Sequence, residues 1–183
     1  MEDLEKIIKI ARTAGYLKRL QRTGWARVGV VKPESVADHT FRVVLLCSVI
    51  TSDRDIDHKK LLEMAVTHDI GETATSDVRT EEGDRFVASQ EAKDMLEESV
   101  MKDIFAPLYN GKHYLNLYYE FRDQSSKEAR LLKQIEKIEM ALQAVEYKEM
   151  GLPEPLTREF VENARKYVED RGLKELLEKV ING

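Results

Sequence analysis

Apolar residues recur at intervals of three and four along most of this chain, a spacing that is typical of amphipathic helices. Four prolines and nine glycines fall mainly between the periodic segments, where they mark turns. The pattern predicts helices over residues 3–20, 36–50, 58–70, 87–105, 111–122 and 125–150, and a further helical segment over 156–181 after the break "LPEP". We therefore expect an all-α fold, and the absence of a repeat or a linker indicates one domain over residues 1–183.

Each expected helix carries an apolar face. The face of the first helix consists of Leu4, Ile7, Ile8, Ala11, Leu17 and Leu20. The inner face of the longest helix consists of Leu132, Ile135, Ile138, Leu142 and Val145. The second helix should begin at Val36, because Ser35 and Asp38 have the spacing of a capping box. Its inner face also carries His39.

The composition indicates a soluble protein and argues against a membrane or a nucleic acid as its partner. Hydrophobic residues make up 42% of the chain and charged residues 34%, which is typical of a soluble globular protein. No apolar run approaches the roughly 20 residues that a membrane-spanning helix needs. The net charge of -5 argues against non-specific nucleic-acid binding. The single Cys47 cannot form an intrachain disulfide, and no signal segment opens the chain. We therefore expect a cytoplasmic protein that binds small molecules or copies of itself.

Histidines and carboxylates on three of the expected helices could form a metal site. His68 and Asp69 stand side by side at the end of the third helix, His39 lies on the inner face of the second, and Glu136 lies at the edge of the inner face of the longest. Imidazole and carboxylate groups are ligands of divalent ions such as Mn, Fe, Co, Ni and Zn. Such a set leaves positions open, so a bound ion could activate water and polarise a phosphoryl group.

Neighbouring residues of a continuous helix point about 100° apart, so His68 and Asp69 can act together only where the helix unwinds. Gly71 favours such unwinding. The alternative is a plain helix end, at which His68 neutralises the helix C-terminus and Asp69 begins a turn. In that interpretation Glu72 and Asp77 are solvated acids, His39 is a core or capping residue, and Glu136 is an exposed partner of Lys133 or Lys137. The residue pattern alone leaves both interpretations open.

Four segments in order resemble one enzyme family. They are "RTGW" (22–25), "PESVADHTFRV" (33–43), "AVTHDIGETATSDV" (65–78) and "KQIEKIEMALQAVEY" (133–147). They follow the H…HD…D pattern of the HD superfamily of metal-dependent phosphohydrolases and are most similar to the HD-domain 5'-deoxynucleotidases. The resemblance spans roughly residues 15–150. It implies an all-helical homodimer that removes the 5'-phosphate from deoxyribonucleoside monophosphates with one divalent ion, which could be Mn, Co, Zn, Ni, Fe or Mg.

The resemblance also implies roles for individual residues. The implied metal ligands are His39, His68, Asp69 and Glu136. Glu72 and Asp77 match acidic residues that act around the water and the sugar-phosphate. We expect Glu72 to transfer protons, because it follows Asp69 by three residues and could reach a metal-bound water. Asp77 is expected to hold the deoxyribose or to assist the leaving oxygen. Trp25 matches a tryptophan that rejects the ribose 2'-hydroxyl by steric exclusion.

This chain departs from the family pattern at two positions. Glu136 replaces the usual aspartate and is one methylene longer, which should change the geometry or metal preference of the site. Gly24 replaces the arginine that precedes the tryptophan in bacterial members. Arg22 or Arg27 could supply that phosphate contact instead, since a guanidinium binds phosphate in a bidentate manner.

Two other functions fit parts of the pattern. One is a different HD phosphohydrolase, acting on nucleoside triphosphates, cyclic nucleotides or guanosine polyphosphates. Trp25 and the segment "ETATSD" favour the monophosphatase over it. The other is a non-catalytic binding protein stabilised by a structural ion. Structural zinc sites usually rely on cysteine, and Cys47 lies elsewhere in the sequence, which argues against it.

Overall fold

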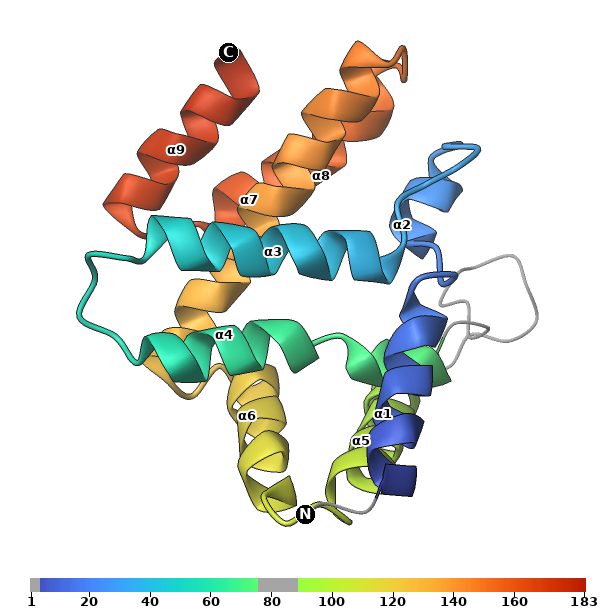
Figure 1. Ribbon diagram of the computed structural model, residues 1–183. Helices are drawn as coiled ribbons and strands as arrows, with labels where there is room; N and C mark the ends of the chain where they lie inside the picture. Colours follow the sequence, from blue (N-terminus) through green and yellow to red (C-terminus); the bar gives the residue numbers. More distant parts are fainter. Residues whose placement is uncertain (1–3, 76–88) are drawn as a thin grey trace.

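The computed structural model describes residues 4–75 and 89–183, and the regular structure in these ranges is helical apart from one isolated β-bridge. The elements, shown in Figure 1, are α1 (Leu4–Leu17), α2 (Thr23–Arg27), α3 (Val36–Ile50), α4 (His58–Thr67), the 3-10 helix η1 (Ile70–Ala74), α5 (Gln90–Phe105), α6 (Gly111–Asp123), α7 (Lys127–Glu149), α8 (Glu154–Tyr167) and α9 (Arg171–Asn182). The expected all-α class is confirmed. The short α2 lies in a stretch that the periodicity indicates as a loop. None of the described helices has the length and apolarity to cross a membrane.

The long helix α7 forms the centre of the main core. It packs against α3, α4, α6, α8 and α9, while α3 and α4 lie side by side across the face of the molecule seen in Figure 1. Leu132, Ile135 and Ile138 are buried as the periodicity predicts, and each contributes roughly 1.5–3 kcal/mol through burial. The prediction for Leu142 and Val145 is wrong, because both are only half-buried.

Near the C-terminal end of α7, the buried face of the helix consists mainly of small residues. Ala141 and Ala144 are fully buried there, and Ala144 packs in a cluster with Trp25, Tyr147 and Phe160. A strict three-and-four pattern of large apolar residues misses this change, because small side chains let α8 and the α2 segment approach α7 closely.

The apolar face of α1 is mostly uncovered. Leu4 is 73% exposed and Ile7 and Ile8 are about half exposed, whereas Leu17 is buried. The expected helix is present, but most of its apolar face lies outside the core of the described chain. The periodicity indicates an amphipathic helix but not which element covers its apolar side.

The chain unwinds at the position where the sequence places His68 and Asp69. Helix α4 ends at Thr67, so the expected end at residue 70 is wrong, and Asp69 has non-helical angles of φ -103° and ψ 8° before η1 begins. A Cβ atom on Gly71 would lie 2.9 Å from the Cβ of Glu97, so glycine is what lets η1 pack closely on α5. The expected unwinding near Gly71 is confirmed, as is the capping box at the start of α3.

Candidate metal centre and active site

His39, His68 and Asp69 meet in the interior of the protein. Asp69 Oδ2 lies 3.1 Å from His68 Nε2 and 3.7 Å from His39 Nε2. One ligand atom from each residue falls within 4.8 Å of the other two. His39 comes from the first turn of α3, and the other two come from the unwound junction between α4 and η1.

These donor atoms lack hydrogen bonds. Among the described residues, Nε2 of His39, Nε2 of His68 and Oδ2 of Asp69 are buried without a hydrogen-bond partner. Leaving a buried polar atom unpaired costs about 1–3 kcal/mol. Two imidazole nitrogens and a carboxylate oxygen are the donor types that divalent transition ions prefer. The three residues therefore fit a divalent metal ion.

The opposite nitrogen of each imidazole is held in place. His68 Nδ1 donates to the carbonyl of Ala65 at 2.6 Å, and His39 Nδ1 contacts Oε2 of Glu139 at 2.5 Å. Glu139 also accepts a 2.8 Å hydrogen bond from Nε of Arg42. A proton on Nδ1 leaves the lone pair of Nε2 for a ligand, which is the usual arrangement of metal-binding histidines.

Electrostatic interactions within the cluster are strong. Burial alone would lower the pKa of His68, but Asp69 and Glu136 raise it to about 9. Burial opposes ionisation of Asp69, yet His68, His39 and Arg22 hold the pKa of its carboxyl well below its usual range. The carboxylate of Asp69 is therefore stabilised in its charged form, as a metal ligand requires.

Glu136 lies in the same cavity but points its oxygens at lysines. Its carboxylate is 2.9 Å from Lys133 Nζ and 3.7 Å from Lys137 Nζ. Burial would raise the pKa of Glu136, and the two ammonium groups lower it to about 2. Its oxygens are not part of the cluster formed by His39, His68 and Asp69. The lysine pairing named as an alternative is thus present, although Glu136 is buried and not exposed.

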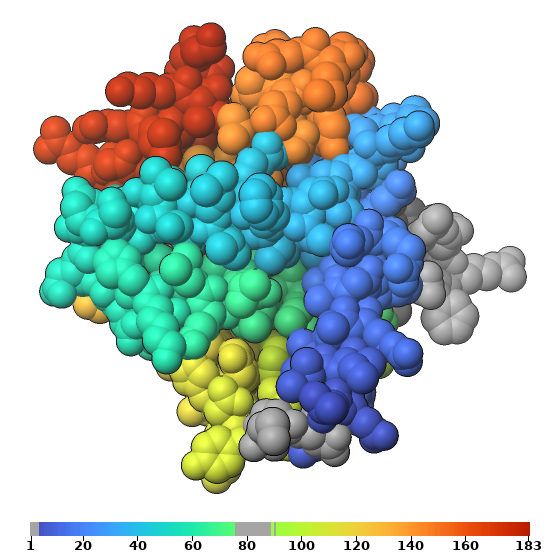
Figure 2. Space-filling view, in the orientation of Figure 1, coloured from blue at the N-terminus to red at the C-terminus, as the bar shows by residue number. Residues whose placement is uncertain are grey.

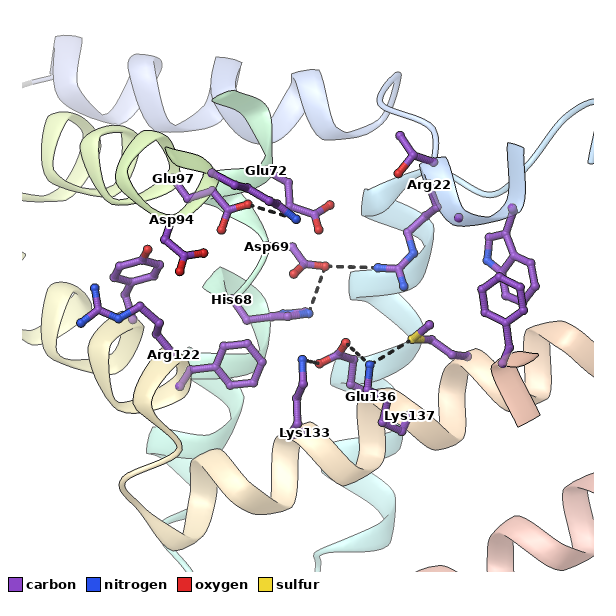
Figure 3. A pocket seen from close by; sticks show the side chains of 18 residues that line it. Arg22, His68, Asp69, Glu72, Asp94, Glu97, Arg122, Lys133, Glu136 and Lys137 are labelled. Carbon is purple, nitrogen blue, oxygen red and sulfur yellow. Dashed lines mark hydrogen bonds and ion pairs between the residues drawn. The ribbon is translucent and has the colours of Figure 1, made fainter. Parts of the chain in front are cut away.

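A cavity of about 370 Å³ opens beside His68 and Asp69 (Figure 3). This is within the usual range for small-molecule sites. Its carboxylates are Asp69, Glu72, Asp94, Glu97 and Glu136. Its cations are Arg22, Lys93, Arg122, Lys133 and Lys137. Its aromatic residues are Trp25, Tyr118, Phe121 and Phe160. The arrangement suits a polar, charged ligand with one flat apolar part.

Glu72 lies on η1 and lines the cavity next to Asp69. Burial raises the pKa of its carboxyl, as does the negative charge of Asp69, to about 7. A carboxyl group with a pKa near neutrality can exchange protons at physiological pH. Asp77, the other acid expected in this role, lies outside the described residues.

The structure separates the two candidate arginines. Arg22 lines the cavity, and its NH1 atom lies 3.5 Å from Oδ2 of Asp69. Its backbone N–H donates to the carbonyl of Glu34, beside the β-bridge that ties this segment to the start of α3. Arg27 lies on the surface, 3.1 Å from Glu159, and is not among the residues that line the cavity.

Trp25 forms part of the cavity lining while being only 1% exposed. Its ring stacks on Phe160 with a centroid distance of 3.8 Å, and Nε1 donates to Oε1 of Glu34 at 2.9 Å. These contacts hold the indole in a fixed position in the cavity wall.

Sequence reasoning missed several residues around the site, above all Glu139, Glu34 and Glu97. One signal for Glu139 is present, since it follows Glu136 by three residues and therefore lies on the same side of α7. Its pairing with His39, one hundred residues away, has no counterpart in local spacing.

Comparisons with known proteins agree with this geometry. The HD domain family model matches residues 14–176. The 5'-deoxynucleotidase HDDC2 of Danio rerio is 32% identical over 167 residues, which cover 90% of this chain and 81% of that protein. The Homo sapiens protein of the same name is 35% identical over 146 residues, which cover 79% of this chain and 69% of that protein. A solved structure from Pyrococcus horikoshii OT3 has a TM-score of 0.73 and 32% identity over 98% of both chains. The chain belongs to the HD domain family.

Proposed function

We propose that the protein is a metal-dependent phosphohydrolase that removes the 5'-phosphate from deoxyribonucleoside 5'-monophosphates. The observation that carries this proposal is the convergence of His39 Nε2, His68 Nε2 and Asp69 Oδ2, buried and without hydrogen bonds, beside a cavity lined by charged residues of both signs. The names of the relatives, 5'-deoxynucleotidases at 32% and 35% identity, support the substrate class.

His39, His68 and Asp69 would hold one divalent ion, and Glu136 completes the proposed donor set from the same cavity. Such an ion, when bound, supplies Lewis-acid polarisation of the phosphoryl group and lowers the pKa of water. A purely structural role fits less well. Structural zinc sites usually include cysteine, whereas the described cluster consists of two histidines and an aspartate.

The other residues of the cavity bind the substrate and move protons. Glu72 lies beside Asp69 and is placed to take the proton of the attacking water. Arg22 presents a guanidinium that can contact two phosphate oxygens at once. Trp25 presents its fixed ring to the sugar, where a 2'-hydroxyl would collide with it. By resemblance, Asp77 would contact the deoxyribose or the leaving oxygen.

The functional unit is proposed to be a homodimer. Phe41, Leu45 and Val49 form an apolar stripe along α3 and are 70%, 50% and 66% exposed. Helix α1, which also exposes apolar residues, lies next to α3 on the face shown in Figure 2. A row of exposed apolar side chains along one helix is typical of an interface. Light scattering after size exclusion should give twice the chain mass, and Phe41→Glu should reduce it; a monomeric parent would refute the dimer.

The activity is tested by phosphate release from the purified, metal-stripped protein. The substrates are dAMP, dCMP, dTMP and the matching ribonucleotides, with Mn, Co, Zn, Ni or Mg added back singly. We expect ion-dependent release of orthophosphate from the deoxy series, which Asp69→Ala abolishes. The control is Asp103→Ala, an exposed aspartate on α5. Release that does not depend on the ion or on Asp69, or pyrophosphate release from triphosphates in its place, would refute the proposal.

A further inference from the structure

Two lysines share one carboxylate on the α7 side of the cavity. Lys133 Nζ lies 2.9 Å from one oxygen of Glu136, and Lys137 Nζ lies 3.7 Å from the other. The side chains of Lys133 and Lys137 are only 32% and 13% exposed. The single negative charge of Glu136 can neutralise one ammonium group but not both.

The remaining contacts of Lys137 do not supply a second negative charge. In the described chain its Nζ atom is 3.7 Å from the sulfur of Met140, a weak acceptor, and 5.3 Å from the ring centre of Tyr167. A largely buried ammonium group is costly unless an anion pairs with it. Lys137 is thus placed to receive an anion that is not part of the protein.

The charges around the whole cavity indicate which anion fits. A histidine that binds a metal ion is neutral, so with the ion bound to His68 the rest of the lining holds five cationic and five carboxylate side chains. The divalent ion of the proposed function adds two positive charges. A phosphate monoester dianion carries two negative charges at neutral pH, which restores the balance.

We infer that Lys137, with Lys133 and Arg22, binds the phosphate group of the substrate. These three residues are called the basic cluster below. Figure 3 shows both lysines on one side of Asp69 and Arg22 reaching toward Asp69, while Glu72 and Glu97 lie on the opposite side. The basic cluster is therefore directed at the space in front of the candidate metal ligands. It selects a dianionic phosphomonoester over a phosphodiester, which carries a single charge. The inference rests on the proposed function for the identity of the phosphate carrier.

The test measures phosphate binding separately from hydrolysis. Inorganic phosphate is titrated calorimetrically into the metal-loaded protein, and dimethyl phosphate serves as the singly charged comparison. We expect Lys137→Met to weaken phosphate binding by about tenfold or more, the loss of a charge-assisted hydrogen bond. Lys137→Arg should stay within about threefold of the parent, because it keeps the charge. The matched control is Lys148→Met, an exposed lysine of the same helix that pairs with Glu154.

Metal content and circular dichroism are measured for each variant, so that loss of the ion or of the fold is not mistaken for loss of phosphate binding. Parental phosphate affinity in a folded, metal-loaded Lys137→Met protein would overturn the inference, as would binding of dimethyl phosphate as tight as that of phosphate. If Lys137→Met does not fold, Lys137→Gln and Lys133→Met provide the same comparison. Phosphate binding that depends on Lys137 without hydrolysis of deoxynucleotides would refute the proposed substrate alone. Hydrolysis with binding independent of Lys137 would refute the basic cluster alone.

Discussion

Replacing Glu139 by glutamine is expected to weaken binding of the divalent ion although Glu139 itself is not a proposed ligand. Both oxygens of this fully buried carboxylate are used, Oε2 by His39 Nδ1 at 2.5 Å and Oε1 by Arg42 Nε at 2.8 Å. Glutamine offers one acceptor and one donor, so it cannot satisfy both partners. If its amide nitrogen faces His39, the ring must carry its proton on Nε2, the atom that faces the metal site. If the amide nitrogen faces Arg42 instead, its N–H group points at the Nε–H group of Arg42, and neither donor has an acceptor there.

The expected loss of metal affinity can be estimated from residues that, like Glu139, hydrogen-bond to the second nitrogen of a metal-binding histidine. Losing the residue that orients a metal-binding histidine typically weakens metal affinity by about 10- to 100-fold. This corresponds to about 1.4–2.8 kcal/mol. The unpaired buried group would also lower the free energy of unfolding by about 1–3 kcal/mol, so thermal unfolding must show that the variant remains folded at the assay temperature.

The assay is calorimetric titration of Mn or Co into the metal-stripped protein, combined with nitrogen NMR of the His39 ring to identify which nitrogen is protonated. Glu146→Gln is the matched control, because Glu146 also binds Arg42, at 2.7 and 2.8 Å, and is not hydrogen-bonded to His39. We expect the control to keep the parental metal affinity. A folded Glu139→Gln protein with parental metal affinity and an unchanged His39 tautomer would refute the reasoning.

Three further predictions concern packing and pH. Gly71→Ala should lower the free energy of unfolding by about 1–3 kcal/mol, measured by urea denaturation, because the new methyl group would lie 2.9 Å from the Cβ of Glu97. Trp25→Ala should lower the free energy of unfolding by about 3–5 kcal/mol, because the indole is buried. Sugar selection is therefore better tested with Trp25→Phe, which we expect to reduce the ratio of kcat/KM for deoxyribonucleotides to that for ribonucleotides. Asp170→Asn should lower the free energy of unfolding by about 1 kcal/mol at pH 7, because it removes the two-point ion pair with Arg54 at 2.8 and 2.9 Å. The asparagine can still cap the N-terminus of α9. Arg54 lowers the pKa of Asp170 from 3.8 to about 2. The stabilisation is therefore present above pH 3.8 and lost as the pH falls toward 2, where the stabilities of parent and variant should converge; a difference that does not change with pH would contradict this cause.

Local spacing in the sequence determined much of the fold and part of the site. The all-α class, the capping box at Ser35, the buried face of α7 through Leu132 and the unwinding before Gly71 all follow from residues within a few positions of one another. Helix periodicity, capping and glycine conformations are local properties, so one sequence contains them. The same local information places His68 and Asp69 together at a helix end.

Tertiary structure alone decided how the helices meet. Periodicity does not show that the apolar face of α1 stays exposed, that Glu139 reaches His39, or that Glu136 is buried with two lysines. It also does not distinguish Arg22 in the cavity from Arg27 on the surface. These outcomes depend on which helices pack together and at what angle, and the packing of ridges into grooves is set by side chains far apart in the chain. The sequence therefore specified the chemical groups, and packing decided which of them converge on one cavity.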